Sequence, residues 1–340
     1  MEYRNLAFGL FTKDSTKTIS KLYSMFSNLN MMDEFASKNT IDLDAKGLVD
    51  VLCIGLHRDL NVNYEHVDKR VNNIKRNNNV IVAFSGGKDS TATALKMKSN
   101  GKNVYLFYVK GINKAYPDEM EHALELAEKL GMPIHIESVK QTGYTSFKES
   151  PIKNQLIASM ALDYAIENNI GCSVAFGDFT TDNVNNSQFM ESWSDTQEMW
   201  SAWVNFVRTY VSNIELIIPF KTYNETLDVV SDNPQILESV CGCILPYRFR
   251  KVTRNNNEKK YGISLIPNRC GSCWKCCTEY IFLADKGVLP LNKKFYRHCL
   301  DFLVKKLPTT RPEIKEINIK GAYEAFLHRP ITKSVLYNEL

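Results

Sequence analysis

Residues 77–95, NNNVIVAFSGGKDSTATAL, decide how this sequence is expected to fold. Val80–Phe84 is an apolar, β-branched run of strand length, and Thr91–Met97 reads as a helix. The intervening segment SGGKDS, Ser85–Ser90, therefore lies on a turn from a strand to a helix. Loops held between two rigid elements commonly carry functional residues, so we place the candidate site at this turn.

The residue types of the turn suit an anion. Gly86 and Gly87 let the backbone bend tightly and bring its N–H groups close to a ligand. Lys88 adds a positive charge, and the following helix offers the positive end of its dipole to a phosphate. Further donors are the hydroxyls of Ser85, Ser90 and Thr91. The alternative is an ordinary Gly-Gly turn that binds nothing.

Asp89 is the one residue of the turn that a phosphate would repel. Its carboxylate is compatible with a phosphate site if a divalent cation lies between them, or if it caps the helix. We therefore expect Asp89 to face magnesium or to act as an N-cap. The turn is not a Walker A loop, which requires GxxxxGK followed by Ser or Thr.

The composition is that of an ordinary globular protein with ample core. The chain has 340 residues, of which 44% are hydrophobic, and a formal net charge of +4. This small excess of positive charge, without a dense basic patch, does not indicate a nucleic-acid-binding surface. No apolar run reaches the roughly 18 residues of a membrane span, so we expect no membrane association and a cytoplasmic location.

The pattern after the turn predicts an α/β fold. Asn103–Lys110 and Ile134–Val139 read as buried strands, and Asp118–Leu130 reads as the helix between them. Further elements follow as a helix at 148–168, strands at 173–176 and 215–220, and a helix at 225–230. This alternation predicts a Rossmann-like, doubly wound parallel sheet of about five strands, in which Tyr108 and Val109 would flank a bound base.

Two later segments offer polar groups at predicted strand ends. Gly177, in GDFTTDN, permits close backbone approach, while Asp178 and Asp182 could bind magnesium or a ribose hydroxyl. The alternative is that these carboxylates cap the loop. Lys221 follows the last predicted strand and is a candidate for the same face of the site, or a structural residue.

Aromatic residues recur at helical spacing after this loop. They are Trp193, Trp200, Trp203, Phe206 and Tyr210. Such a stripe is more often part of a core than a platform on which a base stacks, so we interpret it as core.

The C-terminal third contains a candidate metal site. Cys270, Cys273 and Cys276 form CxxCxxC, whose two-residue gaps let thiolates converge on one centre. A fourth ligand is needed, and Cys243 is preferred over Cys241, both returning to the site if Arg250–Lys260 is a loop. Four thiolates with no open position predict a structural zinc site; an iron-sulfur cluster uses the same ligands and remains the alternative.

The SGGKDS loop resembles the SGGxDS loop of the PP-loop ATP pyrophosphatase superfamily, whose members split ATP between its α and β phosphates. Together with four further motifs, the chain resembles the 7-cyano-7-deazaguanine synthase (QueC) family across residues 78–290. The further motifs are SPIKNQL at Ser150–Leu156, GDFTTD at Gly177–Asp182, IIPF at Ile217–Phe220, and the cysteine segments SVCGC and CGSCWKCC.

The resemblance implies a division of the chain and a set of ligands. Residues 1–76 would be a mostly helical extension, 77–240 the ATP-binding catalytic domain, and 241–340 a lobe with the four-cysteine site. ATP, magnesium and zinc would be the cofactors, and the catalytic residues would be Lys88, Asp89, Lys153, Asp178 and Lys221. The substrates would be a deazapurine carboxylate and ammonia or an amine, with a protein acceptor and a homodimer as further expectations.

The chain also departs from this family. Lys88 stands where the family has an uncharged residue, and Lys153 where it has Arg; the N-terminal extension has no counterpart there. These differences indicate a diverged homologue of the kind found in phage genomes or antiphage defence operons. Three other functions remain open, namely a tRNA thiolase, an asparagine-synthetase-like amide ligase and a non-catalytic nucleotide sensor.

Overall fold

The computed structural model describes residues 40–42, 63–65, 74–110, 118–138, 153–177, 197–208, 211–221, 223–243, 245 and 247–303. The chain divides into two compact units. One, here called the sheet unit, comprises Met1–Ala83, Met97–Lys114 and Met132–Pro219. The other, here called the cysteine unit, comprises Phe84–Lys96, Ala115–Gly131 and Phe220–Leu340. Each is described by itself.

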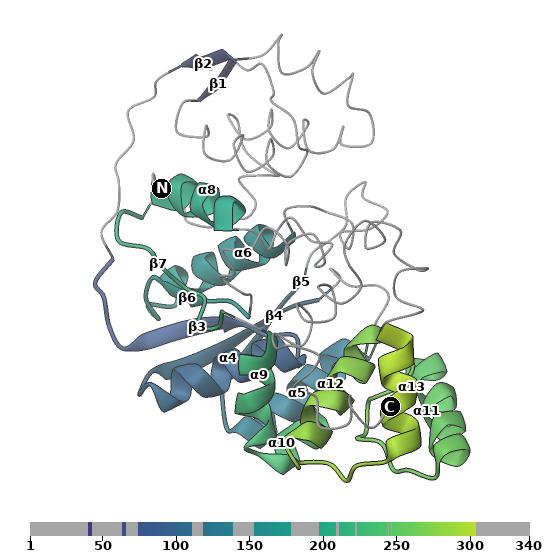
Figure 1. Ribbon diagram of the computed structural model, residues 1–340. Coiled ribbons are helices and arrows are strands. Elements are labelled where there is room, and N and C mark those ends of the chain that lie inside the picture. Colours follow the sequence, from purple (N-terminus) through teal and green to yellow (C-terminus); the bar gives the residue numbers. More distant parts are fainter. Residues whose placement is uncertain are drawn as a thin grey trace. The chain divides into compact units, whose positions relative to one another are not determined.

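A five-stranded parallel sheet forms the sheet unit (Figure 1). Its strands are β3 (Asn79–Ala83), β4 (Asn103–Lys110), β5 (Ile134–Ser138), β6 (Ser173–Ala175) and β7 (Glu215–Ile217). They lie in the order β5-β4-β3-β6-β7, so the chain proceeds from β3 to one edge and then returns to build the other half. The predicted α/β, Rossmann-like class with a doubly wound sheet is confirmed.

β3 is the central strand, and its residues after Asn79 are all apolar. Val80, Ile81 and Val82 are completely buried, as expected for a strand covered on both faces. Helix α6 (Lys153–Glu167) packs on β3 and β6. The strand that leads into SGGKDS is thus buried from Val80 to Ala83.

The aromatic stripe belongs to this core. Helix α8 (Gln197–Arg208) buries Trp200, Trp203 and Phe206, and Trp203 Nε1 donates to Ser159 Oγ on α6 at 2.8 Å. The interpretation of these three residues as core is confirmed. Trp193 and Tyr210 lie outside the described residues.

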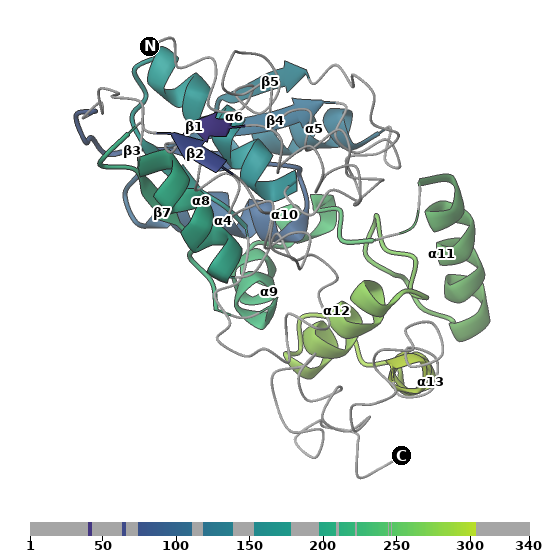
Figure 2. The same ribbon diagram turned by 90° about the horizontal axis from the view of Figure 1, so that it is seen from above.

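The cysteine unit is helical in its described residues (Figures 1 and 2). It contains the first part of α4 (Lys88–Ser99), α5 (Glu119–Leu130), α9 (Tyr223–Ser231), α10 (Pro234–Ser239), α11 (Tyr247–Tyr261), α12 (Trp274–Asp285) and α13 (Lys293–Asp301). α5 ends as predicted at Gly131, which has a φ of 62° and donates to the last turn. α10 packs on α9 and α5, and α12 packs on α9 and α13.

Three boundaries differ from the sequence-based expectation. α4 begins at Lys88, three residues before the expected start, because the Thr91 N–H donates to Gly87 O at 3.0 Å and closes a helical turn within the loop. β7 ends at Ile217 instead of Phe220, since Pro219 has no N–H to donate to a ladder. Arg250–Lys260, expected as a loop, lies inside helix α11.

The N-terminal region contributes one described feature. β1 (Thr40–Asp42) and β2 (Asn63–Glu65) form a parallel pair within the extension that was expected to be mostly helical. Of the extension expected at residues 1–76, residues 1–39, 43–62 and 66–73 lie outside the described residues. Among the described residues, no helix combines the length and apolarity needed to cross a bilayer.

Candidate functional site

The SGGKDS loop adopts a conformation that requires its first glycine. Gly86 has a φ of 70°, and a Cβ there would lie 3.1 Å from the Cα of Ala123 and 3.3 Å from the His122 ring. The loop therefore packs directly on the start of α5, with no space for a side chain. Ser85 is exposed and Gly87 and Asp89 are partly exposed, whereas Gly86, Lys88 and Ser90 are buried, so the turn reaches solvent at part of its length.

Hydroxyl groups stabilise the bend from inside. Ser90 Oγ donates to Gly87 O at 3.1 Å and accepts the Ser85 N–H at 3.3 Å. Thr91 is fully buried, and among the described residues its hydroxyl has no hydrogen-bond partner. Ser90 thus supports the turn, whereas the first-turn N–H groups of α4 point out of the helix with no intrahelical acceptor. Such N–H groups and the positive end of the helix dipole suit an anion.

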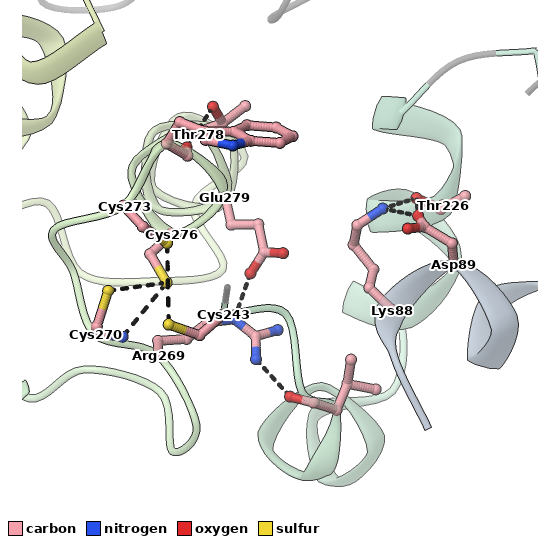
Figure 3. Close-up of polar contacts among 12 residues, drawn as sticks. Lys88, Asp89, Thr226, Cys243, Arg269, Cys270, Cys273, Cys276, Thr278 and Glu279 are labelled. Carbon is pink, nitrogen blue, oxygen red and sulfur yellow. Dashed lines mark hydrogen bonds and ion pairs between the residues drawn. The ribbon is translucent and has the colours of Figure 1, made fainter. Parts of the chain in front are cut away.

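Lys88 and Asp89 form a buried polar group with a residue from α9. Lys88 is 3% exposed, and its Nζ contacts Asp89 Oδ1 and Thr226 Oγ1 (Figure 3). The Thr226 hydroxyl also lies 3.0 Å from Asp89 Oδ1, to which it donates. Burial lowers the pKa of Lys88, and the neighbouring Asp89 carboxylate opposes this effect. Asp89 lies in the first turn of α4 instead of at its N-cap, and its side chain is 28% exposed.

A short segment of the C-terminal region pairs with the loop. The Cys241 N–H donates to Gly86 O at 3.3 Å, and Gly87 and Cys241 form a parallel bridge. Two residues further along the chain, Cys243 enters the cysteine cluster. The phosphate-loop candidate and the cysteine cluster are therefore joined by Cys241–Cys243.

Four thiols converge in the cysteine unit. The Sγ atoms of Cys243, Cys270, Cys273 and Cys276 all lie within 4.8 Å of one another, and all four residues are buried. The Cys243–Cys273 and Cys270–Cys276 Sγ separations are 3.9 and 3.8 Å. A tetrahedron with zinc–sulfur bonds of about 2.3 Å has edges of about 3.8 Å, so the four thiols fit one zinc-sized ion.

The surroundings of the four thiols act in opposite directions on the thiolate form that a metal needs: the pKa values of Cys243 and Cys273 are lowered, and those of Cys270 and Cys276 are raised. Backbone N–H groups of Leu245 and Ser272 donate to Cys243 Sγ at 3.4 Å and Cys270 Sγ at 3.3 Å. Hydrogen bonds from its neighbours hold the pKa of Cys273 well below that of an ordinary thiol, whereas burial raises the pKa of Cys276 well above it. Four buried thiolates need a cation to balance their charge.

The turn that carries Cys270 is closely packed. Gly271 has a φ of 71°, and a Cβ there would lie 2.8 Å from Leu265 Cδ1 and 2.9 Å from Phe295 Cζ. Asn257 Nδ2, on α11, donates to Cys270 O and to Ser272 Oγ, each at 2.7 Å. Asn257 is 8% exposed, so the segment Arg250–Lys260 that was expected to be a loop contains a buried support of the cluster.

A buried ion pair lies beside the cluster. Arg269 and Glu279 have side chains 5% and 2% exposed and form a salt bridge between Nε and Oε2 (Figure 3). Burial alone would lower the pKa of Arg269, but Glu279 and Cys276 together raise it. A Cβ at Gly242 would lie 2.5 Å from Glu279 Oε1, so this pair also needs a glycine in the Cys241–Cys243 segment.

The remaining predicted site residues lie as follows. Tyr108 and Val109 are buried in β4, Gly177 is partly buried after β6, and Lys221 is exposed with its backbone N–H donating to Glu225 at 2.8 Å. Lys153 is the first residue of α6. Asp178 and Asp182 lie outside the described residues. Of the predicted site residues, the cysteine unit contains Ser85–Thr91, Lys221 and the four converging cysteines.

Sequence reasoning missed Thr226, His122, Arg269 and Glu279. Each comes from a helix or turn outside the SGGKDS loop, and no local motif marks Thr226 or His122. A signal existed for two of them: Arg269 directly precedes the first cysteine of CxxCxxC, and Glu279 lies three residues after its last. Charged residues this close to buried ligands are candidates for supporting roles.

Comparisons with known proteins leave the family of this chain open. No protein-family profile matches it, and no curated protein is similar to it. Among solved structures, a predicted subunit of tRNA methyltransferase from Methanocaldococcus jannaschii shares 20% identity, covering 44% of this chain and 73% of that one, with a TM-score of 0.29. NMN synthetase from Francisella tularensis shares 12% identity, covering 86% of this chain and 93% of that one, with a TM-score of 0.33. TM-scores this low carry no conclusion about function.

Proposed function

We propose that this chain is an ATP-dependent ligase that activates a carboxylate by adenylation and releases pyrophosphate. One observation carries the proposal: the SGGKDS loop follows the central strand β3, opens helix α4, and bends at Gly86 with a φ of 70°. Ligands of doubly wound sheets bind at the carboxyl ends of strands near the point where the strand order reverses. In this sheet the strand order reverses at β3, because β4 and β5 are added on one side of it and β6 and β7 on the other.

The charges of the loop suit the departure of pyrophosphate. Attack of a carboxylate on the α-phosphate leaves negative charge on pyrophosphate, which backbone N–H groups and a helix N-terminus stabilise. Asp89, partly exposed and paired with Lys88, would hold magnesium, which supplies positive charge to the phosphates. Lys88 keeps the Asp89 carboxylate in place through its contacts with Asp89 and Thr226. The reaction needs no covalent nucleophile.

The substrate we propose is a 7-deazaguanine carboxylate, with ammonia, an amine or a protein amine as the acceptor. The ordered motifs SGGKDS, SPIKNQL, GDFTTD, IIPF and the cysteine segments support this substrate class. Because Lys88 and Lys153 depart from the family pattern, the substrate is the part of the proposal that needs testing first.

For the cysteine cluster we propose zinc in a structural role. Sγ separations of 3.8 and 3.9 Å support a single ion bound by four thiolates, with no open coordination position. An iron-sulfur cluster places its thiolates on different iron atoms around a larger core, so its ligands would lie further apart. The metal would hold the Cys241–Cys243 segment beside the loop.

One observation favours a second function, thiol chemistry on an adenylated substrate. Cys241 is outside the cysteine cluster and hydrogen-bonds through its backbone to the phosphate-loop candidate. Burial, however, raises the pKa of its thiol, so the reactive thiolate would be a minor form near neutral pH. A thiolase would lose activity on Cys241→Ser, whereas the proposed ligase would keep it.

The test is pyrophosphate release from ATP in the presence of 7-carboxy-7-deazaguanine and ammonia. We expect Lys88→Ala and Asp89→Ala to lower the rate by about a hundredfold or more, the range seen when one transition-state contact is removed. Lys129→Gln is the control, because it removes an exposed cation paired with Glu125. Full activity in both loop variants would refute the assignment, and nucleotide binding without pyrophosphate release would indicate a sensor.

A further inference from the structure

The guanidinium of Arg269 has three donor nitrogens, and described residues accept hydrogen bonds from two of them. Nε is paired with Glu279 Oε2, and Nη1 donates to Val240 O. Nη2 is buried, and among the described residues it has no hydrogen-bond partner. Because buried charged donors almost always have a partner, the unpaired Nη2 indicates that an acceptor is missing.

The same guanidinium contacts, through Nη1, the segment that pairs with the phosphate-loop candidate. Val240 accepts from Arg269, and the next residue, Cys241, donates its N–H to Gly86 O at 3.3 Å. In Figure 3, Arg269 and Glu279 lie between the cysteine cluster and Lys88. Electrostatic effects agree with this arrangement, because Glu279 acts on both Arg269 and Lys88.

We infer that Arg269 Nη2 binds an anionic oxygen of the ligand held at the SGGKDS loop. The inference rests on the proposed function, since it assigns a second anion-binding group to the same site. Glu279 balances the guanidinium charge when no ligand is present, so the side chain can stay buried and preorganised. Because Gly242 has no side chain, the Arg269–Glu279 ion pair can lie directly against the backbone at this residue.

Two sources of the anionic oxygen share this chemistry. One is a phosphate oxygen of ATP or pyrophosphate, and the other is the carboxylate of the acid to be activated. Arginine suits both because its planar donors match the geometry of either group. The two sources are distinguished by measuring the affinities for pyrophosphate and for 7-carboxy-7-deazaguanine separately.

The experiment is isothermal titration calorimetry on the full chain and three variants. Arg269→Gln combined with Glu279→Gln removes the charge pair as a unit, so no uncompensated charge stays buried. Arg269→Lys keeps the positive charge but has a single donor group, and it serves if the double variant does not fold. Lys129→Gln is the matched control, since it removes a cation from the same unit without touching the loop. Metal content and thermal melting are recorded for each.

We expect the two Arg269 variants to lose about tenfold or more in affinity for one anion, with adenosine binding and metal content unchanged. Lys129→Gln should stay within about twofold of the wild type. Unchanged affinity for both anions in a folded, metal-loaded variant would overturn the inference, as would a wild type that binds neither anion. A wild type that binds pyrophosphate through Arg269 but releases none from ATP would leave the inference standing and refute the proposed ligase.

Discussion

Gly86 is the residue on which the loop geometry depends. Its φ of 70° disfavours any side chain, and the backbone of Ala123 lies 3.1 Å from where a Cβ would be. Gly101 has a similar φ of 75°, but nothing lies within 4 Å of its Cβ position. Substituting each glycine by alanine therefore distinguishes two destabilising effects. Gly101→Ala reports the backbone conformation alone, and Gly86→Ala adds the steric contact with α5.

This comparison leads to a stability prediction. Gly101→Ala should lower the free energy of unfolding by about 1 kcal/mol, the cost of Ala at a positive φ, and Gly86→Ala should lower it by more. Gly86→Ala should also weaken pyrophosphate binding, because the loop must move away from α5. Denaturant unfolding and calorimetry measure the two effects. Equal destabilisation and unchanged binding in both variants would show that the close approach is not needed.

His122 gives a pH-dependent prediction. Burial lowers the pKa of its ring below the ordinary 6.5. The charged groups that modify this shift are Glu125, Arg250, Asp118 and Arg269. The unfolded chain therefore binds a proton at this ring at a higher pH than the folded chain does. The stability due to neutral His122 is complete above pH 6.5 and is lost as the pH falls through the lowered pKa.

His122→Gln should accordingly reduce the loss of melting temperature between about pH 6.5 and pH 5. Melting curves of both proteins across this range measure the difference, with pH 7.5 as the reference at which neutral His122 contributes fully. A variant that loses as much stability on acidification as the wild type would contradict the prediction.

Among the helices and strands, the central strands of the sheet could be predicted from the sequence, whereas helix α11, which supports the cysteine cluster through Asn257, could not. β3, β4 and α5 were predictable because their signals are local, namely β-branched runs and a helix stopped by Gly131 and Pro133. α11 was missed because its sequence is rich in polar residues and Asn. Its helical pattern becomes visible only when Arg250 and Asn257, seven residues apart, are recognised as inward-facing.

The cysteine cluster gives a prediction that separates two neighbouring thiols. Cys243→Ser should release the metal and lower the melting temperature, because it removes a ligand from a four-thiolate site. Cys241→Ser should keep one metal ion per chain, since its Sγ is not among the four converging atoms. Elemental analysis of the purified variants measures the metal. Loss of the ion from Cys241→Ser with retention by Cys243→Ser would reverse the assignment.

For the whole molecule, the doubly wound α/β class followed from the order of strands and helices in the sequence. The division into two compact units could not be predicted in this way. SGGKDS, within Phe84–Lys96, belongs to the same unit as the cysteines, whereas β3 belongs to the other. This grouping depends on contacts between distant residues, such as Lys88 with Thr226 and Gly86 with Cys241. Local propensity carries no information about such pairs, so the sequence predicted the loop and not its partners.

The central claim is that the SGGKDS loop binds ATP so that its bond between the α and β phosphates is broken. The most direct measurement is the identity of the nucleotide product when the full chain is incubated with α-labelled ATP, magnesium, ammonia and 7-carboxy-7-deazaguanine. The account predicts labelled AMP and an equal amount of pyrophosphate. Labelled ADP with inorganic phosphate, or no cleavage of ATP by a folded and metal-loaded protein, would contradict it.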